Sequence, residues 1–287
     1  MKGFIAVLIF LSLGILGCDA QVHENIKRLE SARDRLEANP KDEEALATIL
    51  KLLTDSNGIN RSNAAAVLGQ AGEKVGGSIK DRAIPPLAKL LEEGDGSDKR
   101  SAAIALSGFG EHASEAIPVL RKNLFPSNTD VAFFSAEALG KIGEPAAVAV
   151  PDLVRVVEEN SAASKPTYFD VHQAATQALG RIGPKASPAA PRLTALLAQT
   201  KDVELKIKLA VALMRIDPPN VTAVSEIELI MQAPEVDTRV GMMMELMGAG
   251  VASRPALKVI KSAAEKDKEP DVRGMAQQLL TKLGTVR

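Results

Sequence analysis

Few residues of this chain have side chains suited to catalysis or metal binding, and they lie far apart. The 287 residues include three histidines, His23, His112 and His172, and one cysteine, Cys18. Metal sites and nucleophilic centres need such residues at characteristic spacings. The histidines have no such spacing, and no zinc-protease, serine-hydrolase or phosphate-loop motif occurs. The sequence therefore predicts no catalytic residue, metal site, cofactor or small-molecule ligand, and we expect the protein not to be an enzyme.

The cysteine lies at the end of an apolar N-terminal segment. Lys2 precedes an uncharged run from Gly3 to Gly17, which is too short to span a bilayer and suits a secretory signal. An exported chain with one cysteine has no disulfide framework to build. The stretch Ile15-Leu16-Gly17-Cys18 resembles the bacterial lipobox. That resemblance implies cleavage before Cys18 and acylation of this cysteine.

Three processing outcomes are open for this N-terminus. With a lipobox, residues 1–17 are the signal peptide, and residues 18–41 hold the lipidated N-terminus, a short linker and a capping helix. In enteric-type lipoproteins an Asp after the lipidated cysteine, here Asp19, often implies retention at the periplasmic face of the inner membrane. The alternatives are ordinary secretory cleavage after Ala20, which gives a secreted or soluble periplasmic protein, and an uncleaved anchor with a buried cysteine.

The rest of the chain consists of elements that recur about every 33 residues. The hexapeptide ALGKIG at 138–143 returns as ALGRIG at 178–183. Related copies end at residues 72, 110, 217, 250 and 284. A second motif of the type AIPVLRKNL (116–124) alternates with the first. A period of this length is typical of a solenoid of helical pairs.

Each repeat can be interpreted as helix A, a turn and helix B. Prolines such as Pro85 and Pro118 are expected in the first turn of helix A, where a missing N–H costs little. Helix B carries small residues four positions and one position before a leucine that recurs in every repeat. We call this residue the anchor leucine. Small residues at this spacing allow close helix packing. The terminal glycine is expected to end helix B with a positive φ. The anchor leucines are Leu68, Leu106, Leu139, Leu179, Leu213, Leu246 and Leu280.

This pattern resembles the HEAT repeat family, in particular the short bacterial HEAT-like repeats of phycobilin lyases and deoxyhypusine hydroxylase. The resemblance covers residues 42–287 and implies an all-α, right-handed α-solenoid of about seven helical hairpins. Residues 24–38 are predicted to form an N-terminal capping helix. The His-Glu pairs that bind iron in the hydroxylase are not matched here. A lyase acting on cytoplasmic phycobiliproteins is not expected of an exported chain.

Six residues are candidates for binding a partner protein. Tyr168 and Phe169 lie in an insertion, residues 159–169, that lengthens the fourth repeat. The other four lie on B helices at positions expected to face the concave side: Phe133, Ile207, Val240 and Met244. The neighbouring Met242 and Met243 are expected in the core.

The composition and the repeats together favour a scaffold. The net charge of −1 gives no basic footprint for nucleic acid, so none is expected as a partner. We expect a membrane-tethered, non-enzymatic lipoprotein that binds a protein or peptide on its concave face. The alternatives are an accessory subunit or unrecognised enzyme of envelope metabolism, and a soluble secreted solenoid.

Overall fold

The structure is a computed structural model that describes residues 20–125, 129–160 and 170–284. Every regular element within these residues is a helix, which confirms the all-α prediction. The predicted capping helix is α2 (Ala20–Ala38), which packs on α3 and α4. Seven helical pairs follow in the described residues, as the repeats predict. The remaining α-helices are α3 (Glu43–Leu53), α4 (Gly58–Glu93), α5 (Gly96–Phe109), α6 (Ile117–Lys122), α7 (Thr129–Ile142), α8 (Val150–Asn160), α9 (Val171–Ile182), α10 (Ala190–Gln199), α11 (Val203–Ile216), α12 (Val221–Ile230), α13 (Val236–Ala249), α14 (Leu257–Lys266) and α15 (Pro270–Lys282).

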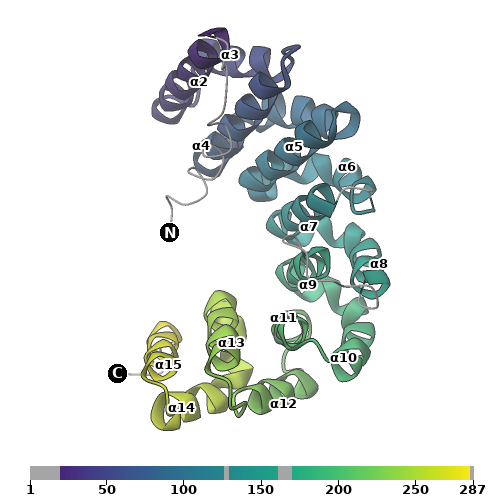
Figure 1. Cartoon of the computed structure of the whole chain (residues 1–287), viewed down its shortest axis with the longest axis vertical. Coiled ribbons are helices and arrows are strands. Elements are labelled where there is room, and N and C mark those ends of the chain that lie inside the picture. The colour runs from purple at the N-terminus through teal and green to yellow at the C-terminus, as the bar shows by residue number, and fades with distance from the viewer. Residues whose placement is uncertain (1–19, 126–128, 161–169, 285–287) are drawn as a thin grey trace.

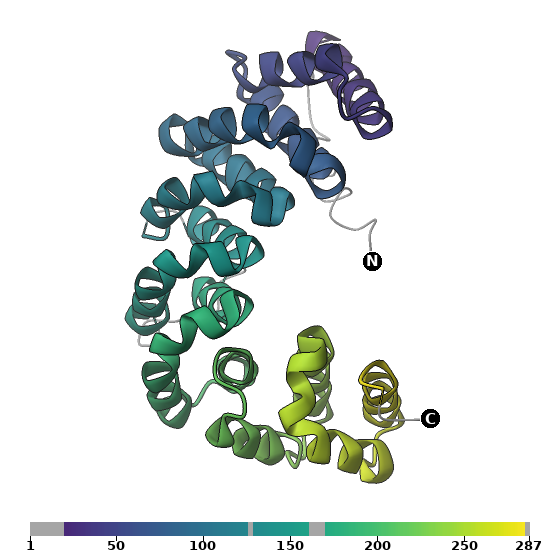
Figure 2. The ribbon, with the colours of Figure 1, turned by 180° about the vertical axis from the view of Figure 1, so that it is seen from behind.

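The helical pairs form two layers of a curved solenoid. Figure 1 shows helices α5, α7, α9, α11, α13 and α15 on the inner side of an arc, and α6, α8, α10, α12 and α14 on its outer side. We call these the inner and outer layers. The view from behind shows the same arc, with the first and last helical pairs at its two ends (Figure 2). The hydrophobic core runs continuously between the layers from repeat to repeat.

Glycine ends most of the inner helices, as predicted. Gly110, Gly143, Gly183, Gly250 and Gly284 have φ between 52° and 75°, a region that side chains with a Cβ rarely adopt. The first four are followed by short 3₁₀ segments that lead into the next outer helix: η1 (Gly110–Ala116), η2 (Glu144–Ala149), η3 (Gly183–Ala189) and η4 (Gly250–Ala256). Pro118, Pro151 and Pro191 are then the second residues of α6, α8 and α10, also as predicted.

The first connection between repeats differs from this prediction. Helix α4 runs through Gly72 and is only kinked at Val75, so that it joins the inner helix of the first repeat to the outer helix of the second. Gly72 therefore does not end a helix. A Cβ on it would lie within 2.7 Å of the Phe109 ring, so this glycine makes room for the largest core side chain. Pro85 consequently lies inside α4 and not in a first turn.

Adjacent inner helices approach one another through glycine and alanine. A Cβ placed on Gly140 of α7 would lie 2.8 Å from the Cα of Ala178 in α9. A Cβ placed on Gly180 of α9 would lie 3.0 Å from the Cα of Ala212 in α11. Real Cβ atoms essentially never lie as close as the first distance and rarely as close as the second, so glycine is favoured at both positions. The glycine directly after the anchor leucine of one inner helix thus packs on the alanine directly before the anchor leucine of the next inner helix.

The contact between α11 and α13 departs from this rule. At the corresponding positions α11 has the buried Met214 and α13 has Glu245. Polar contacts cross this junction: Lys208 Nζ lies 2.9 Å from Glu245 Oε1, and Arg215 donates a 2.6 Å hydrogen bond to the carbonyl of Gly248. Both views show α11 nearly end-on while α13 lies across the view, so the solenoid changes direction here. Bulkier side chains at the junction account for this reoriented packing.

The Gly–Ala contact predicts opposite effects for one substitution at two sites. Gly140→Ala is expected to lower the free energy of unfolding by about 1–3 kcal/mol, because the new methyl group overlaps the backbone of α9. Gly274→Ala in α15 meets open space and is expected to raise it by up to about 1 kcal/mol through helix propensity. Urea unfolding followed by circular dichroism measures both. Equal effects at the two sites would contradict the packing described here.

Candidate protein-binding surface

The inner helices expose one stripe of side chains each. On α7 the partly or fully exposed residues include Phe133, Glu137 and Lys141, which lie six before, two before and two after the anchor leucine. On α9 the same positions hold Gln173, Gln177 and Arg181. The other faces are buried against the outer layer and against neighbouring inner helices. Repetition of the pair thus places equivalent positions side by side on the inner layer.

The apolar candidates on this stripe are unequally exposed. Met244 on α13 is 59% exposed, whereas Met242 and Met243 are fully buried, as predicted. Val240 is half-buried against the core. Ile207 is only 6% exposed, so its prediction as a surface residue is wrong. Its Cδ1 lies 3.6 Å from the Cβ position of Gly241, and the side chain fills the space that this glycine leaves on α13.

Of the three aromatic candidates, Phe133 is the one that lies within the described residues. Phe133 is half-buried and packs edge-on against Phe134, with ring centroids 5.2 Å apart and an interplanar angle of 87°. An edge-to-face pair of this kind is a favourable arrangement for two aromatic rings. Tyr168 and Phe169 lie outside the described residues, as does Cys18. Phe133 therefore packs on a residue of its own helix and remains partly exposed.

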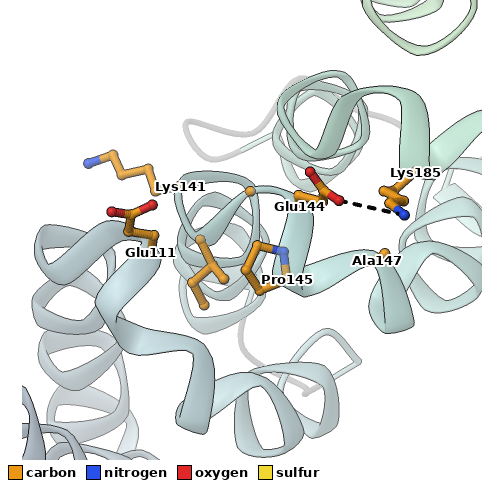
Figure 3. Close-up of a pocket in the computed structure, with 8 residues that line it drawn as sticks. Glu111, Lys141, Glu144, Pro145, Ala147 and Lys185 are labelled. Carbon is orange, nitrogen blue, oxygen red and sulfur yellow. Dashed lines mark ion pairs between the residues drawn. The ribbon is translucent and has the colours of Figure 1, made fainter.

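A cleft of about 820 Å³ opens where the inner helices end. Figure 3 shows its lining from one helix end and three connections: Lys141 from the end of α7, Glu111 from η1, Glu144 and Pro145 from η2, and Lys185 from η3. Glu144 Oε1 and Lys185 Nζ form an ion pair at 3.6 Å. The remaining lining is apolar, from Ile142, Gly143 and Ala147. The lining thus combines charges of both signs with apolar surface.

A second cleft, of about 900 Å³, lies between α2, α3 and the start of α4. Its lining is polar and carries charges of both signs, including Lys27, Arg35 and Asp55. Arg35 is held by Asp42 and Glu44 at 2.9 and 2.8 Å. This cleft belongs to the junction of the capping helix with the first repeat.

The histidines occupy separate places in the fold. His23 is exposed on α2, and His112 lies in η1 against Gly76 and Gly77 of α4. His172 is buried at the start of α9; burial lowers its pKa, although Asp170 and Asp202 act in the opposite direction. Within the described residues, no three histidine, cysteine or carboxylate side chains gather as a metal site would require.

Arginine–aspartate pairs hold successive repeats in register. Arg239 of α13 makes two hydrogen bonds to Asp267, at 2.9 and 3.1 Å, and two more to the carbonyls of Ala233 and Pro234. The side chains of the pair are 9% and 6% exposed. Burial raises the pKa of Asp267, but hydrogen bonds from Arg239 and from the Glu269 N–H outweigh this and hold the pKa below its usual range. Arg61 and Asp98 make a corresponding pair between the first two repeats.

Comparison with known proteins agrees with this architecture. Residues 28–107 and 84–165 match the family of HEAT repeats. The resemblance to this family is confirmed for that part of the chain, and the remaining helical pairs continue the same solenoid. Among curated proteins, no sequence matches the chain.

Solved structures show the same HEAT-type fold at low identity. The complex of CpcE and CpcF of phycocyanin lyase from Nostoc sp. PCC7120 has a TM-score of 0.56 at 20% identity, with 83% of this chain and 94% of that chain covered. Kap121p has a TM-score of 0.65 at 17% identity and covers 92% of this chain, which spans about a third (34%) of Kap121p. An engineered protein has a TM-score of 0.53 at 20% identity, with 92% and 79% covered. Similarity at this level shows the fold alone.

The sequence interpretation overlooked a row of cations on the inner layer. Lys141, Arg181 and Arg215 occupy the same position, two residues after the anchor leucine, on α7, α9 and α11. The signal was present in the repeated hexapeptides ALGKIG, ALGRIG and ALMRID, whose fourth residue is Lys or Arg in each case. We call these three residues the cation row.

The Arg239–Asp267 pair predicts a large and pH-dependent effect. Arg239→Met is expected to lower the free energy of unfolding by about 3–5 kcal/mol at pH 7, because it leaves a buried carboxylate without its partner. Since the pKa of Asp267 is lowered on folding, its stabilisation is complete above the unfolded value of about 4 and is lost as the pH falls through the folded value. Urea unfolding at pH 7 and pH 3 measures this. A double variant, Arg239→Met with Asp267→Leu, is the control and is expected to lose less than Arg239→Met alone; an equal or larger loss would contradict the pairing.

Proposed function

We propose that the protein is a non-enzymatic scaffold that binds another protein on its inner layer. The observation that carries this proposal is the repeated stripe: equivalent positions of successive inner helices form one continuous surface over several repeats. It presents an exposed methionine, a partly exposed phenylalanine and a row of cations, residue types that can anchor a partner. Within the described residues, no cluster of three or more histidine, cysteine or carboxylate side chains offers a metal site.

We further propose that the scaffold is tethered to the outer side of the cytoplasmic membrane through a lipid on Cys18. Support comes from the sequence, since Cys18 closes a lipobox-like stretch. Helix α2 begins at Ala20, two residues later, so a lipid at Cys18 would hold the solenoid close to the bilayer surface. None of the helices within the described residues is long and apolar enough to cross a membrane.

The binding proposal predicts crosslinking from one layer only. A photo-reactive amino acid at Met244, on the inner layer, is expected to crosslink to a specific envelope protein in intact cells. The matched control is the same amino acid at Lys261, which is exposed on α14 in the outer layer. Gel shift and mass spectrometry identify the product. A crosslink of equal yield from Lys261, or none from Met244, would contradict the proposal.

The tethering proposal predicts loss of membrane association in Cys18→Ala. Because cleavage and acylation both require the cysteine of a lipobox, this variant is expected to lose its mature acylated form. Fractionation and mass spectrometry of the mature N-terminus measure both properties. A wild-type protein that begins at Gln21 would instead establish ordinary secretion and contradict the tether.

A further inference from the structure

Arg181 is a cation that has no partner among the described residues. It is exposed near the C-terminal end of α9, and its guanidinium makes no hydrogen bond or ion pair within the described residues. Each of the other two cations of the row has one partner in the described residues. Lys141 pairs with Glu137 of its own helix at 3.4 Å, and Arg215 donates to the backbone carbonyl of Gly248. No carboxylate is therefore bound to either arginine of the row.

The Gly–Ala contacts hold the members of the row close together. The Cδ of Arg181 lies 3.4 Å from the Cβ position of Gly140, the residue before Lys141. The Cδ of Arg215 lies 3.5 Å from the Cβ position of Gly180, the residue before Arg181. Each arginine stem thus runs over the glycine of the preceding helix. Burial lowers the pKa of Arg215, and repulsion by Arg181 lowers it further, with Glu245 acting in the opposite direction. The row is a surface on which like charges repel.

Apart from Glu137, which pairs with Lys141, the nearby carboxylates of the described residues form no ion pair with the row. Glu245 is held by Lys208 at 2.9 Å, and Glu144 by Lys185 at 3.6 Å. Glu111 lines the cleft beside Lys141 in Figure 3, with no ion pair drawn between them. An anionic group supplied from outside would relieve the repulsion between the two arginines and give Arg181 a partner, and Arg is well suited to bidentate binding of a carboxylate.

We infer that the partner binds along the cation row through an extended acidic segment with a carboxylate at every third residue. Packed helices lie about 8–10 Å apart, so successive cations have about that spacing. An extended polyproline II segment advances about 3.1 Å per residue and repeats every three residues, about 9 Å. Carboxylates at every third position therefore lie on one face at the spacing of the row. This inference rests on the proposed function, whose inner-layer binding surface it makes specific.

Three labelled peptides test the inference on the full-length protein. The first is a fluorescein-labelled dodecapeptide with Glu at every third position among Ser and Pro. The second has the same composition with its Glu residues adjacent, and the third has Lys in place of Glu. Fluorescence anisotropy is expected to show binding of the first, at least several-fold weaker binding of the second, and none of the third. Raising salt from 50 to 200 mM is expected to weaken binding, as screening requires.

Two charge reversals serve as the matched pair of variants. Arg181→Glu is expected to weaken binding of the first peptide about tenfold or more, because it places like charges together. Lys261→Glu, on the outer layer, makes the same charge change and is expected to leave binding unaltered. Arg181→Gln, which is expected to give an intermediate loss, replaces Arg181→Glu if that variant does not fold by circular dichroism.

The outcomes separate this inference from the proposed function. Three results would overturn the inference that the partner binds through an acidic segment. They are equal binding of the first two peptides, equal loss of binding in the two charge-reversal variants, and no binding of any peptide. If Met244 still crosslinks to an envelope protein in that case, the inner layer binds a partner by other chemistry and the proposed function stands. If Met244 crosslinks to nothing while the first peptide binds selectively, the proposed function is contradicted as tested at Met244, and binding of an acidic segment along the cation row still stands.

Discussion

The structure depends on how closely neighbouring inner helices approach. The glycine after one anchor leucine packs on the backbone of the alanine before the next, so α7, α9 and α11 lie as near to one another as their backbones allow. This contact repeats because the sequence repeats, and it leaves no room for a side chain. It also determines what the inner surface presents. A residue two positions after the anchor leucine must lie beside its equivalents on the adjacent helices, and here those residues are Lys141, Arg181 and Arg215.

Function in such a fold follows from rows of residues more than from single residues. Within the described residues no three histidine, cysteine or carboxylate side chains gather as a metal site would require, whereas a single helical position repeated on three helices creates a row of charged side chains. The solenoid then turns between α11 and α13, where Met214 and Glu245 replace glycine and alanine. That junction ends the cation row and brings Met244 to the inner surface of the following helix.

Periodicity alone was sufficient to predict the seven helical pairs, the capping helix, the glycine at five helix ends and the buried Met242 and Met243. These features follow from local rules that each repeat obeys independently. The errors arise where one repeat responds to another. Gly72 was expected to end a helix, but its lack of a side chain accommodates Phe109 from the next repeat. Ile207 was expected at the surface, but Gly241 in the following helix leaves space that buries it. Contacts of this kind depend on the spacing between helices, which the sequence of a single repeat does not contain.

The central claim is that the inner layer is the partner-binding surface and that its cation row orients the partner. The most direct measurement is the structure of the complex with the partner protein captured through Met244. We predict that the partner lies over α7, α9 and α11, with its carboxylates within hydrogen-bonding distance of Lys141, Arg181 and Arg215. A partner bound to the outer helices, or to either end of the solenoid with the cation row exposed to solvent, would contradict the account.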